Sequence, residues 1–280
     1  MKLPEKEQVL SNLSGFNVSE AEARQQEIYA AADSEIWRQA VYEPLHGGWD
    51  LACIAGRPFL NFIISDSALG PQSSVLELGS GAGAACDYLA SSSNAAIVGI
   101  ERNAAQCERA RARRSDVRPG SLTFVCADAS KWRASSPNFT CAYLLDTLSL
   151  VDDWDGMLSA ARSALPEGQA LYIADQCAGE NIQADTLQRA YQLDGFLALR
   201  PAAHLREVLK NQRFGSVEQR DANADAIAAF STMQAALGRL SATPASTIDP
   251  DVLAAWSELT DFYLAAFKNR ELVYTRTKAW

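Results

Sequence analysis

The segment from Val75 to Ala84 constrains the fold most, because an apolar run breaks there into three alternating glycines, Gly79, Gly81 and Gly83. The apolar run predicts a buried strand. Glycine at these points lets the backbone turn tightly and lets a ligand approach where a Cβ would collide. Such a junction is typical of nucleotide-type cofactor sites. Alone it is ambiguous, since Gly79-x-Gly81-x-x-Ala84 also satisfies the dinucleotide fingerprint.

Strands and helices alternate after this junction, which predicts βαβ units and an α/β fold with a mostly parallel sheet. The expected strands are Val75–Leu78, Ala96–Ile100, Leu122–Cys126, Cys141–Leu145 and Ala170–Ala174. The expected helices are Ala84–Ser91, Ala104–Arg114 and Trp154–Leu165, and a further helix opened by Pro201 leads to a strand at Gly215–Arg220.

The length of 280 residues exceeds what this core needs, and the surplus lies before Leu69, between Ala178 and Arg200, and between Asp221 and Arg270. Apolar residues recur there at helical spacing. We therefore expect an N-terminal helical lid over residues 1–70, a cofactor-binding core over 71–220 and a helical insertion over 221–270. The period-two pattern of residues 271–280 predicts a closing strand.

Charge and composition exclude several classes of protein. The chain has 25 Lys+Arg against 34 Asp+Glu, a formal net charge of -9, so no overall positive field attracts nucleic acid. No uncharged apolar stretch approaches the roughly 18 residues that a membrane span requires. The six cysteines form no CxxC pair and have no neighbouring histidine, so we expect free thiols, no metal site and a cytoplasmic location.

Acidic residues lie at the carboxyl ends of four successive expected strands: Glu77, Glu101, Asp128 and Asp146. Glu77 precedes Gly79 by two residues, where a carboxylate suits a cationic ammonium or sulfonium better than a pyrophosphate. Glu101 lies 22 residues after Gly79, placed to accept hydrogen bonds from ribose hydroxyls. Asp128 could accept an adenine amino hydrogen, or could only cap the turn before Ser130. The carboxyl ends of parallel strands meet at one edge of a sheet, where open α/β folds bind ligands.

These residues together resemble the motifs of class I S-adenosylmethionine-dependent methyltransferases of the small-molecule type. The resemblance rests on Glu77-x-Gly79-x-Gly81-x-Gly83, Glu101 and Asp128, and it covers about Pro71 to Arg220 and the terminal strand. It implies a Rossmann-like seven-stranded sheet, mostly parallel with an antiparallel last strand. It also implies S-adenosylmethionine as cofactor and S-adenosylhomocysteine as product.

The resemblance also implies roles for individual residues. The methionine part of the cofactor would lie against Gly79, Ser80 and Gly81, and its ribose would be held by Glu101. The adenine would be bordered by Asp128 and Ala129, while Arg102 and Gln106 would line the ribose or adenine. The sulfonium would have Leu145 and Asp146 beside it, and these two residues would face the acceptor.

Aromatic residues and one histidine in the additions are candidates for the acceptor side. Tyr42 and Trp49 flank a segment that Pro44, Gly47 and Gly48 predict to be a loop, and they resemble a segment that closes over the cofactor in such enzymes. His46, in the same segment, has a pKa suited to accepting a proton, or is a loop residue bonded to backbone. In the second addition, Tyr191 and Phe196 are candidates for lining the acceptor, or pack only against neighbouring helices.

The expected function is methyl transfer to the nitrogen or oxygen of a small molecule, in a closed pocket and in natural-product biosynthesis. The expected partner is that small molecule, without nucleic acid or membrane, and the chain is a monomer or a homodimer. The motifs report cofactor binding rather than transfer. A cyclase, an isomerase or a non-transferring binding protein therefore stays an alternative, as does an NAD-dependent oxidoreductase that uses the same glycines.

Overall fold

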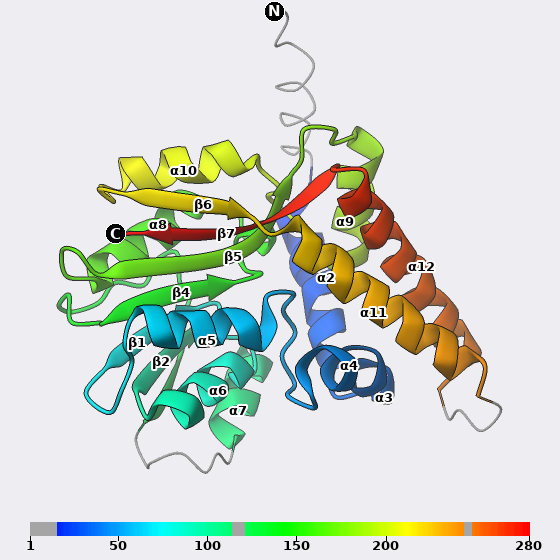
Figure 1. The fold of residues 1–280 in the computed structure, drawn as a ribbon, viewed down its shortest axis with the longest axis horizontal. Coiled ribbons are helices and arrows are strands. Elements are labelled where there is room, and N and C mark those ends of the chain that lie inside the picture. Colours follow the sequence, from blue (N-terminus) through cyan, green and yellow to red (C-terminus); the bar gives the residue numbers. More distant parts are fainter. Residues whose placement is uncertain (1–15, 114–120, 244–247) are drawn as a thin grey trace, which may run out of the picture.

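A computed structural model describes residues 16–113, 121–243 and 248–280. Within these residues seven strands form one sheet in the order β3-β2-β1-β4-β5-β7-β6 (Figure 1). The strands are β1 (Ser74–Leu78), β2 (Ala96–Glu101), β3 (Leu122–Cys126), β4 (Cys141–Leu145), β5 (Ala170–Ala178), β6 (Val217–Asp221) and β7 (Leu272–Ala279). β1 to β5 are parallel, whereas β7 pairs antiparallel with both β5 and β6. The predicted Rossmann-like sheet is confirmed.

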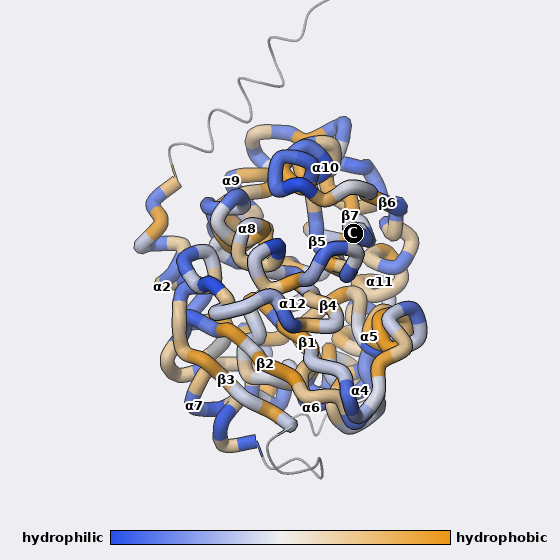
Figure 2. Tube along the Cα trace, turned by 90° about the vertical axis from the view of Figure 1, so that its left-hand side faces the viewer, coloured by the Kyte–Doolittle hydropathy of each residue, from blue (hydrophilic) through white to orange (hydrophobic). Residues whose placement is uncertain are grey.

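Burial explains which strands are central. Every residue of β4 and β5 is buried, as a parallel strand covered on both faces requires. β3 and β6 lie at the edges and keep exposed residues. Figure 2 shows hydrophobic residues along β2 and β3 and hydrophilic residues gathered on α10 (Ala202–Asn211) at the surface.

Helices cover both faces of the sheet and bury two separate hydrophobic clusters. Val75 belongs to the cluster under α5 (Gly56–Asp66) and α6 (Ala84–Ser93). The next residue, Leu76, belongs to the cluster under α8 (Trp154–Ala164) and α10. Successive strand residues point to opposite faces, so one strand serves both clusters. α7 (Ala104–Ala112) packs against β2 and β3.

The additions gather beyond the carboxyl ends of the parallel strands (Figure 1). They comprise α2 (Val18–Ala30), α3 (Glu35–Trp37), the π-helix η2 (Arg38–Tyr42), α4 (Glu43–His46), α9 (Ala184–Asp194), α11 (Asn223–Ser241) and α12 (Pro250–Lys268), while the 3-10 helix η3 (Leu148–Leu150) follows β4. α11 packs along α12, α2 along α9, and α11 also contacts α4. The three surplus segments of the sequence therefore meet at one end of the sheet.

Several local expectations were wrong. The predicted loop at Tyr42–Trp49 is helical as far as His46, because Pro44 stands in the first turn, where a helix tolerates proline, and Gly47 ends the helix at φ 60°. β5 extends to Ala178 because β7 pairs with it along that whole length. The described residues do not include residues 1–15 of the expected lid, Arg114 at the end of the expected helix Ala104–Arg114, or residues 244–247 of the expected helical insertion.

The turn after β4 depends on the buried carboxylate of Asp175, which is 1% exposed. Its Oδ2 accepts the backbone N–H groups of Thr147 at 2.7 Å and Leu148 at 2.6 Å. Its Oδ1 accepts the N–H of Gln176 at 2.9 Å. Burial raises the pKa of Asp175, and these hydrogen bonds oppose the rise. One side chain on β5 thus fixes the backbone that leaves β4.

We expect Asp175→Ala to lower the free energy of unfolding by about 3 kcal/mol or more, because buried N–H groups lose their acceptor. Urea denaturation followed by circular dichroism measures the change. Asp153→Ala is the matched control: Asp153 caps α8 by accepting the N–H of Gly156, and losing such a cap costs about 1 kcal/mol. Equal costs for the two variants would contradict the role assigned to Asp175.

Candidate functional site

The glycine junction provides both close packing and open space. Gly79 has φ +81°, and a Cβ there would collide with the side chain of Thr147. Gly81 has φ +51°, yet a Cβ there would meet nothing within 4 Å. Gly79 is therefore required by the protein's own packing, whereas Gly81 leaves space that a ligand can occupy.

That space belongs to a cavity of about 290 Å³, here called the glycine cavity. Six of the predicted cofactor residues line it: Gly79, Gly81, Glu101, Arg102, Asp128 and Ala129. The sequence did not reveal the lining residues of α2 and of the turn after β4, Glu22, Gln25, Gln26, Thr147, Leu150 and Val151. No motif marks these residues, because long-range packing brings them to the cavity.

Hydrogen bonds hold two carboxylates in place at the carboxyl ends of strands β2 and β3. Glu101 accepts the N–H of Gly81 at 2.9 Å through Oε2 and the N–H of Asn103 at 2.8 Å through Oε1. Asp128 accepts both the N–H and the hydroxyl of Ser130, at 3.0 and 2.8 Å. Burial acts to raise the pKa of Asp128, but hydrogen bonds from Lys131 and Ser130 hold it below its ordinary value. Asp128 thus caps its turn and also lines the cavity.

α2 covers the glycine cavity through polar contacts. Arg102 donates to Glu22 at 2.8 Å and to Gln25 Oε1 at 2.9 Å. The amide nitrogen of Gln25 donates to the carbonyls of Gly195, at 2.8 Å, and Leu150, at 3.2 Å. Gln25 is 6% exposed. The residue after Glu101 therefore fastens the N-terminal addition to the core.

A second cavity of about 320 Å³, here called the helical chamber, lies among the additions. Its aromatic lining residues are Trp37, Phe196, Phe230, Trp256 and Tyr263, and its polar ones include Arg24, Gln25, Glu27, Asp146, Gln176 and Asp194. All three surplus segments contribute, together with Asp146 at the end of β4. Gln25 and Leu150 line both cavities, so the helical chamber adjoins the glycine cavity.

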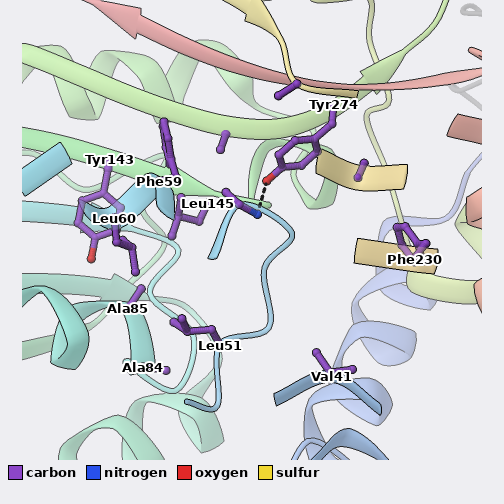
Figure 3. Close-up of a cluster of buried hydrophobic side chains, with 14 of the residues drawn as sticks. Val41, Leu51, Phe59, Leu60, Ala84, Ala85, Tyr143, Leu145, Phe230 and Tyr274 are labelled. Carbon is purple, nitrogen blue, oxygen red and sulfur yellow. Dashed lines mark hydrogen bonds between the residues drawn. The ribbon is translucent and has the colours of Figure 1, made fainter. Parts of the chain in front are cut away.

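Asp146 stands in a strained conformation, with φ 46°. Its Oδ2 accepts the N–H of Ile54 at 2.7 Å, while Oδ1 is shielded from water without a hydrogen bond of good geometry. Burial and the neighbouring Asp175 raise the pKa of Asp146 to about 8. Tyr274 lies beside this carboxylate, and its hydroxyl accepts the N–H of Ala55 at 3.2 Å (Figure 3).

Two prominent candidates from the sequence are buried away from both cavities. Glu77 is 3% exposed and accepts hydrogen bonds from Tyr143 and Cys86, both at 2.8 Å; burial raises its pKa to about 7. His46 is 2% exposed, and neither ring nitrogen has a hydrogen bond of good geometry to a described residue. Burial and the positive charge of Arg57 lower the pKa of His46 to about 4. The imidazole is thus neutral at physiological pH.

Of the remaining candidates, only Phe196 lines the helical chamber. Three others are buried: Ser80 beside the glycine junction, Gln106 on α7 and Leu145 at the end of β4. The hydroxyl of Tyr42 donates to the carbonyl of Ala32 at 2.9 Å. Trp49 packs edge-on against Tyr88 with ring centroids 5.1 Å apart, and Tyr191 stacks on Phe16 with ring centroids 4.2 Å apart. The described residues contain no cluster of acids, cysteines and histidines that could hold a metal ion.

Comparison with known families settles the class of the core. Residues 75–168 match the family model described as a methyltransferase domain. This part of the core is therefore similar to a methyltransferase domain. The resemblance to class I S-adenosylmethionine-dependent methyltransferases is confirmed, and so is the fold that it implies. No curated protein matches the chain in sequence.

Solved structures share the fold of this methyltransferase domain and its additions. Phosphoethanolamine N-methyltransferase 2 of Haemonchus contortus, in complex with S-adenosyl-L-methionine, is 14% identical with a TM-score of 0.77, covering 88% of this chain and 56% of that one. The cyclopropane synthase MmaA2 of Mycobacterium tuberculosis is 11% identical with a TM-score of 0.72, covering 90% and 95%. Geranyl diphosphate C-methyltransferase of Streptomyces coelicolor is 12% identical with a TM-score of 0.62, covering 79% and 76%.

These likenesses establish the fold, and the chain spans little more than half the length of the Haemonchus enzyme. None of the helices in the described ranges is long and apolar enough to cross a membrane.

Proposed function

We propose that the chain is an S-adenosylmethionine-dependent methyltransferase that holds its cofactor in the glycine cavity and a small-molecule acceptor in the helical chamber. The observation that carries the proposal is that the two cavities adjoin, with Gln25 and Leu150 lining both. A methyl donor in one cavity and an acceptor in the other can then approach in line, as displacement at a methyl carbon requires.

The glycine cavity fits the cofactor on two structural grounds. Gly81 leaves open a space that a Cβ would fill, and the carboxylates of Glu101 and Asp128 line the cavity as acceptors for hydroxyl and amino groups. We assign the methionine part to Gly79, Ser80 and Gly81, the ribose to Glu101, the adenine to Asp128 and Ala129, and supporting contacts to Glu77, Arg102, Gln106 and Leu145. Glu77 acts from behind the junction, because it lies in the core.

The protein's own residues perform three tasks in the transfer. The cofactor, when bound, supplies an activated methyl group on a positively charged sulfur. The walls of the helical chamber exclude water from that group, since Trp37, Phe230 and Trp256 present apolar surface. Asp146 faces the acceptor and takes its proton, because a carboxyl with a pKa near neutrality suits general base catalysis.

His46 is the second candidate for the proton acceptor. Its ordinary pKa suits the task, but the lowered pKa and the burial away from both cavities favour Asp146. The aromatic residues Tyr42, Trp49 and Tyr191 then act as supports of the additions, and Phe196 as a wall of the helical chamber.

Transfer to nitrogen or oxygen, a place in natural-product biosynthesis, a cytoplasmic location and a monomeric or homodimeric state complete the proposal. The alternative of a cyclase, an isomerase or a binding protein makes a different prediction. It requires that S-adenosylhomocysteine not accumulate in proportion to product, which chromatography of the reaction mixture measures. The match to a methyltransferase domain leaves an NAD-dependent oxidoreductase without support.

We expect Gly81→Ala to weaken binding of S-adenosylhomocysteine at least about tenfold, because its methyl group projects into the glycine cavity. Isothermal titration calorimetry measures the affinity. Gly168→Ala is the matched control: Gly168 has φ +81° with open space around it and does not line the glycine cavity. Both variants carry left-handed strain, so equal affinities would mean that Gly81 does not face the cofactor.

We expect Asp146→Asn to lower kcat about 100-fold or more while cofactor affinity changes little, since an amide cannot accept the proton. His46→Gln tests the second candidate and should keep most of the turnover. The reverse result, with Asp146→Asn active and His46→Gln inactive yet folded, would assign the base to His46.

We expect kcat/KM to rise with pH well above the ordinary aspartate range of about 4, up to about 8. The sign follows from the need for an ionised base, whose pKa burial and Asp175 raise while Ile54 and Tyr274 oppose the rise. A profile already flat from pH 5 to 8 would show that Asp146 is not the group that titrates.

A further inference from the structure

The charges of the helical chamber point to a class of acceptor; this inference rests on the proposed function. Three carboxylates line the chamber, those of Glu27, Asp146 and Asp194. Arg24 is the one cationic side chain among the described residues that line it. Its Nε donates to the carbonyl of Leu193 at 2.8 Å, and its Nη1 pairs with Glu27 at 3.0 Å. Both of these contacts already engage the positive charge of Arg24.

Asp194 is the carboxylate least explained by the fold. It is the last residue of α9, where the aligned carbonyl groups of the helix add negative potential. Its Oδ2 accepts a hydrogen bond from Tyr263 on α12. Burial raises the pKa of Asp194 to about 6, although Tyr263 and the charge of Arg24 oppose the rise. The carboxylate is therefore ionised at neutral pH in a place where water shields it poorly.

Aromatic rings surround these acids. Trp37 and Trp256 meet edge-on with ring centroids 5.1 Å apart, and Phe230 stacks on Tyr263 at 5.3 Å. Aromatic faces attract cations, most strongly where water is excluded, and they also bind apolar groups. A chamber that combines ring faces with the ionised carboxylate of Asp194 is complementary to an organic cation.

We propose that the acceptor is an amine carried on an apolar body, with Asp194 binding its positive charge on entry and the aromatic walls holding the body. A phosphate ester does not fit, because the carboxylate of Asp194 repels a phosphate and Arg24 is already paired with Glu27. The acceptor therefore differs from the phosphomonomethylethanolamine and geranyl diphosphate bound by the Haemonchus and Streptomyces enzymes.

The proton and electron balance is complete with the groups named. The ammonium loses one proton to the carboxylate of Asp146, which becomes neutral. The lone pair of the amine nitrogen then forms a bond to the methyl carbon, and the electrons of the carbon–sulfur bond go to the sulfur. The positive charge ends on the methylated amine, and the sulfur leaves as a neutral thioether.

The test uses the full chain saturated with S-adenosylhomocysteine and three probes: tryptamine, its alcohol counterpart tryptophol, and phosphoethanolamine. Calorimetry at pH 7.5, roughly one unit or more above the pKa of Asp194, measures each affinity. We expect tryptamine to bind at least about tenfold more tightly than tryptophol, and phosphoethanolamine not to bind. Equal binding of amine and alcohol, binding of phosphoethanolamine, or no binding of tryptamine would overturn the proposal.

A variant tests whether Asp194 binds the positive charge of the amine. Asp194→Asn keeps an acceptor for the Tyr263 hydroxyl and should weaken tryptamine about tenfold while leaving tryptophol unchanged. The matched control is Asp185→Asn, which removes the same charge from the exposed start of α9. An equal loss in both variants would assign the effect to general charge. Failure to bind S-adenosylhomocysteine at all refutes the proposed function instead, so the two failures are distinguishable.

Discussion

The antiparallel pairing of β7 with β5 is the contact on which the arrangement of the site depends. It runs from the pair Leu171–Ala279 to the pair Ala178–Leu272 and places the C-terminal strand between β5 and β6. Because β7 runs against the parallel strands, it starts at their carboxyl edge. α12, which precedes β7, must therefore end at that edge and carries its aromatic face over the site. Tyr274 then reaches across to the N–H of Ala55 and joins the N-terminal addition to the same strand.

Buried carboxylates give this edge its chemistry. Asp146 directly follows β4, and Asp175 lies on the neighbouring strand β5. Burial raises the cost of ionising both, and the charge of Asp175 raises it further for Asp146. Asp175 meets that cost with three backbone N–H donors, whereas Asp146 has one. The carboxylate with fewer donors keeps the higher pKa and faces the helical chamber. The same arrangement thus separates a structural acid from the acid that we propose as the base.

The sequence predicted what local patterns encode. Gly79, Gly81, Glu101 and Asp128 were found because each lies at or just after the end of a strand, and parallel strands bring those positions to one edge. His46 could not be placed, because helical packing after Pro44, rather than the loop expected there, buries it. Asp194, Trp256 and Gln25 carry no motif. They reach the site only when segments far apart in sequence pack together, and composition and spacing do not report such contacts.

Gln25 connects the glycine cavity with the helical chamber. Its amide group accepts from Arg102, beside the predicted ribose site, and donates to the carbonyls of Leu150, which lines both cavities, and of Gly195, which lies between the chamber residues Asp194 and Phe196. Loss of any of these hydrogen-bond partners leaves a buried polar group unsatisfied, which costs about 1–3 kcal/mol of stability. α2 therefore cannot leave one cavity without opening the other. Because transfer to a buried acceptor requires water to be absent from both sides of the methyl group, one helix fastened to both cavities is what the chemistry needs.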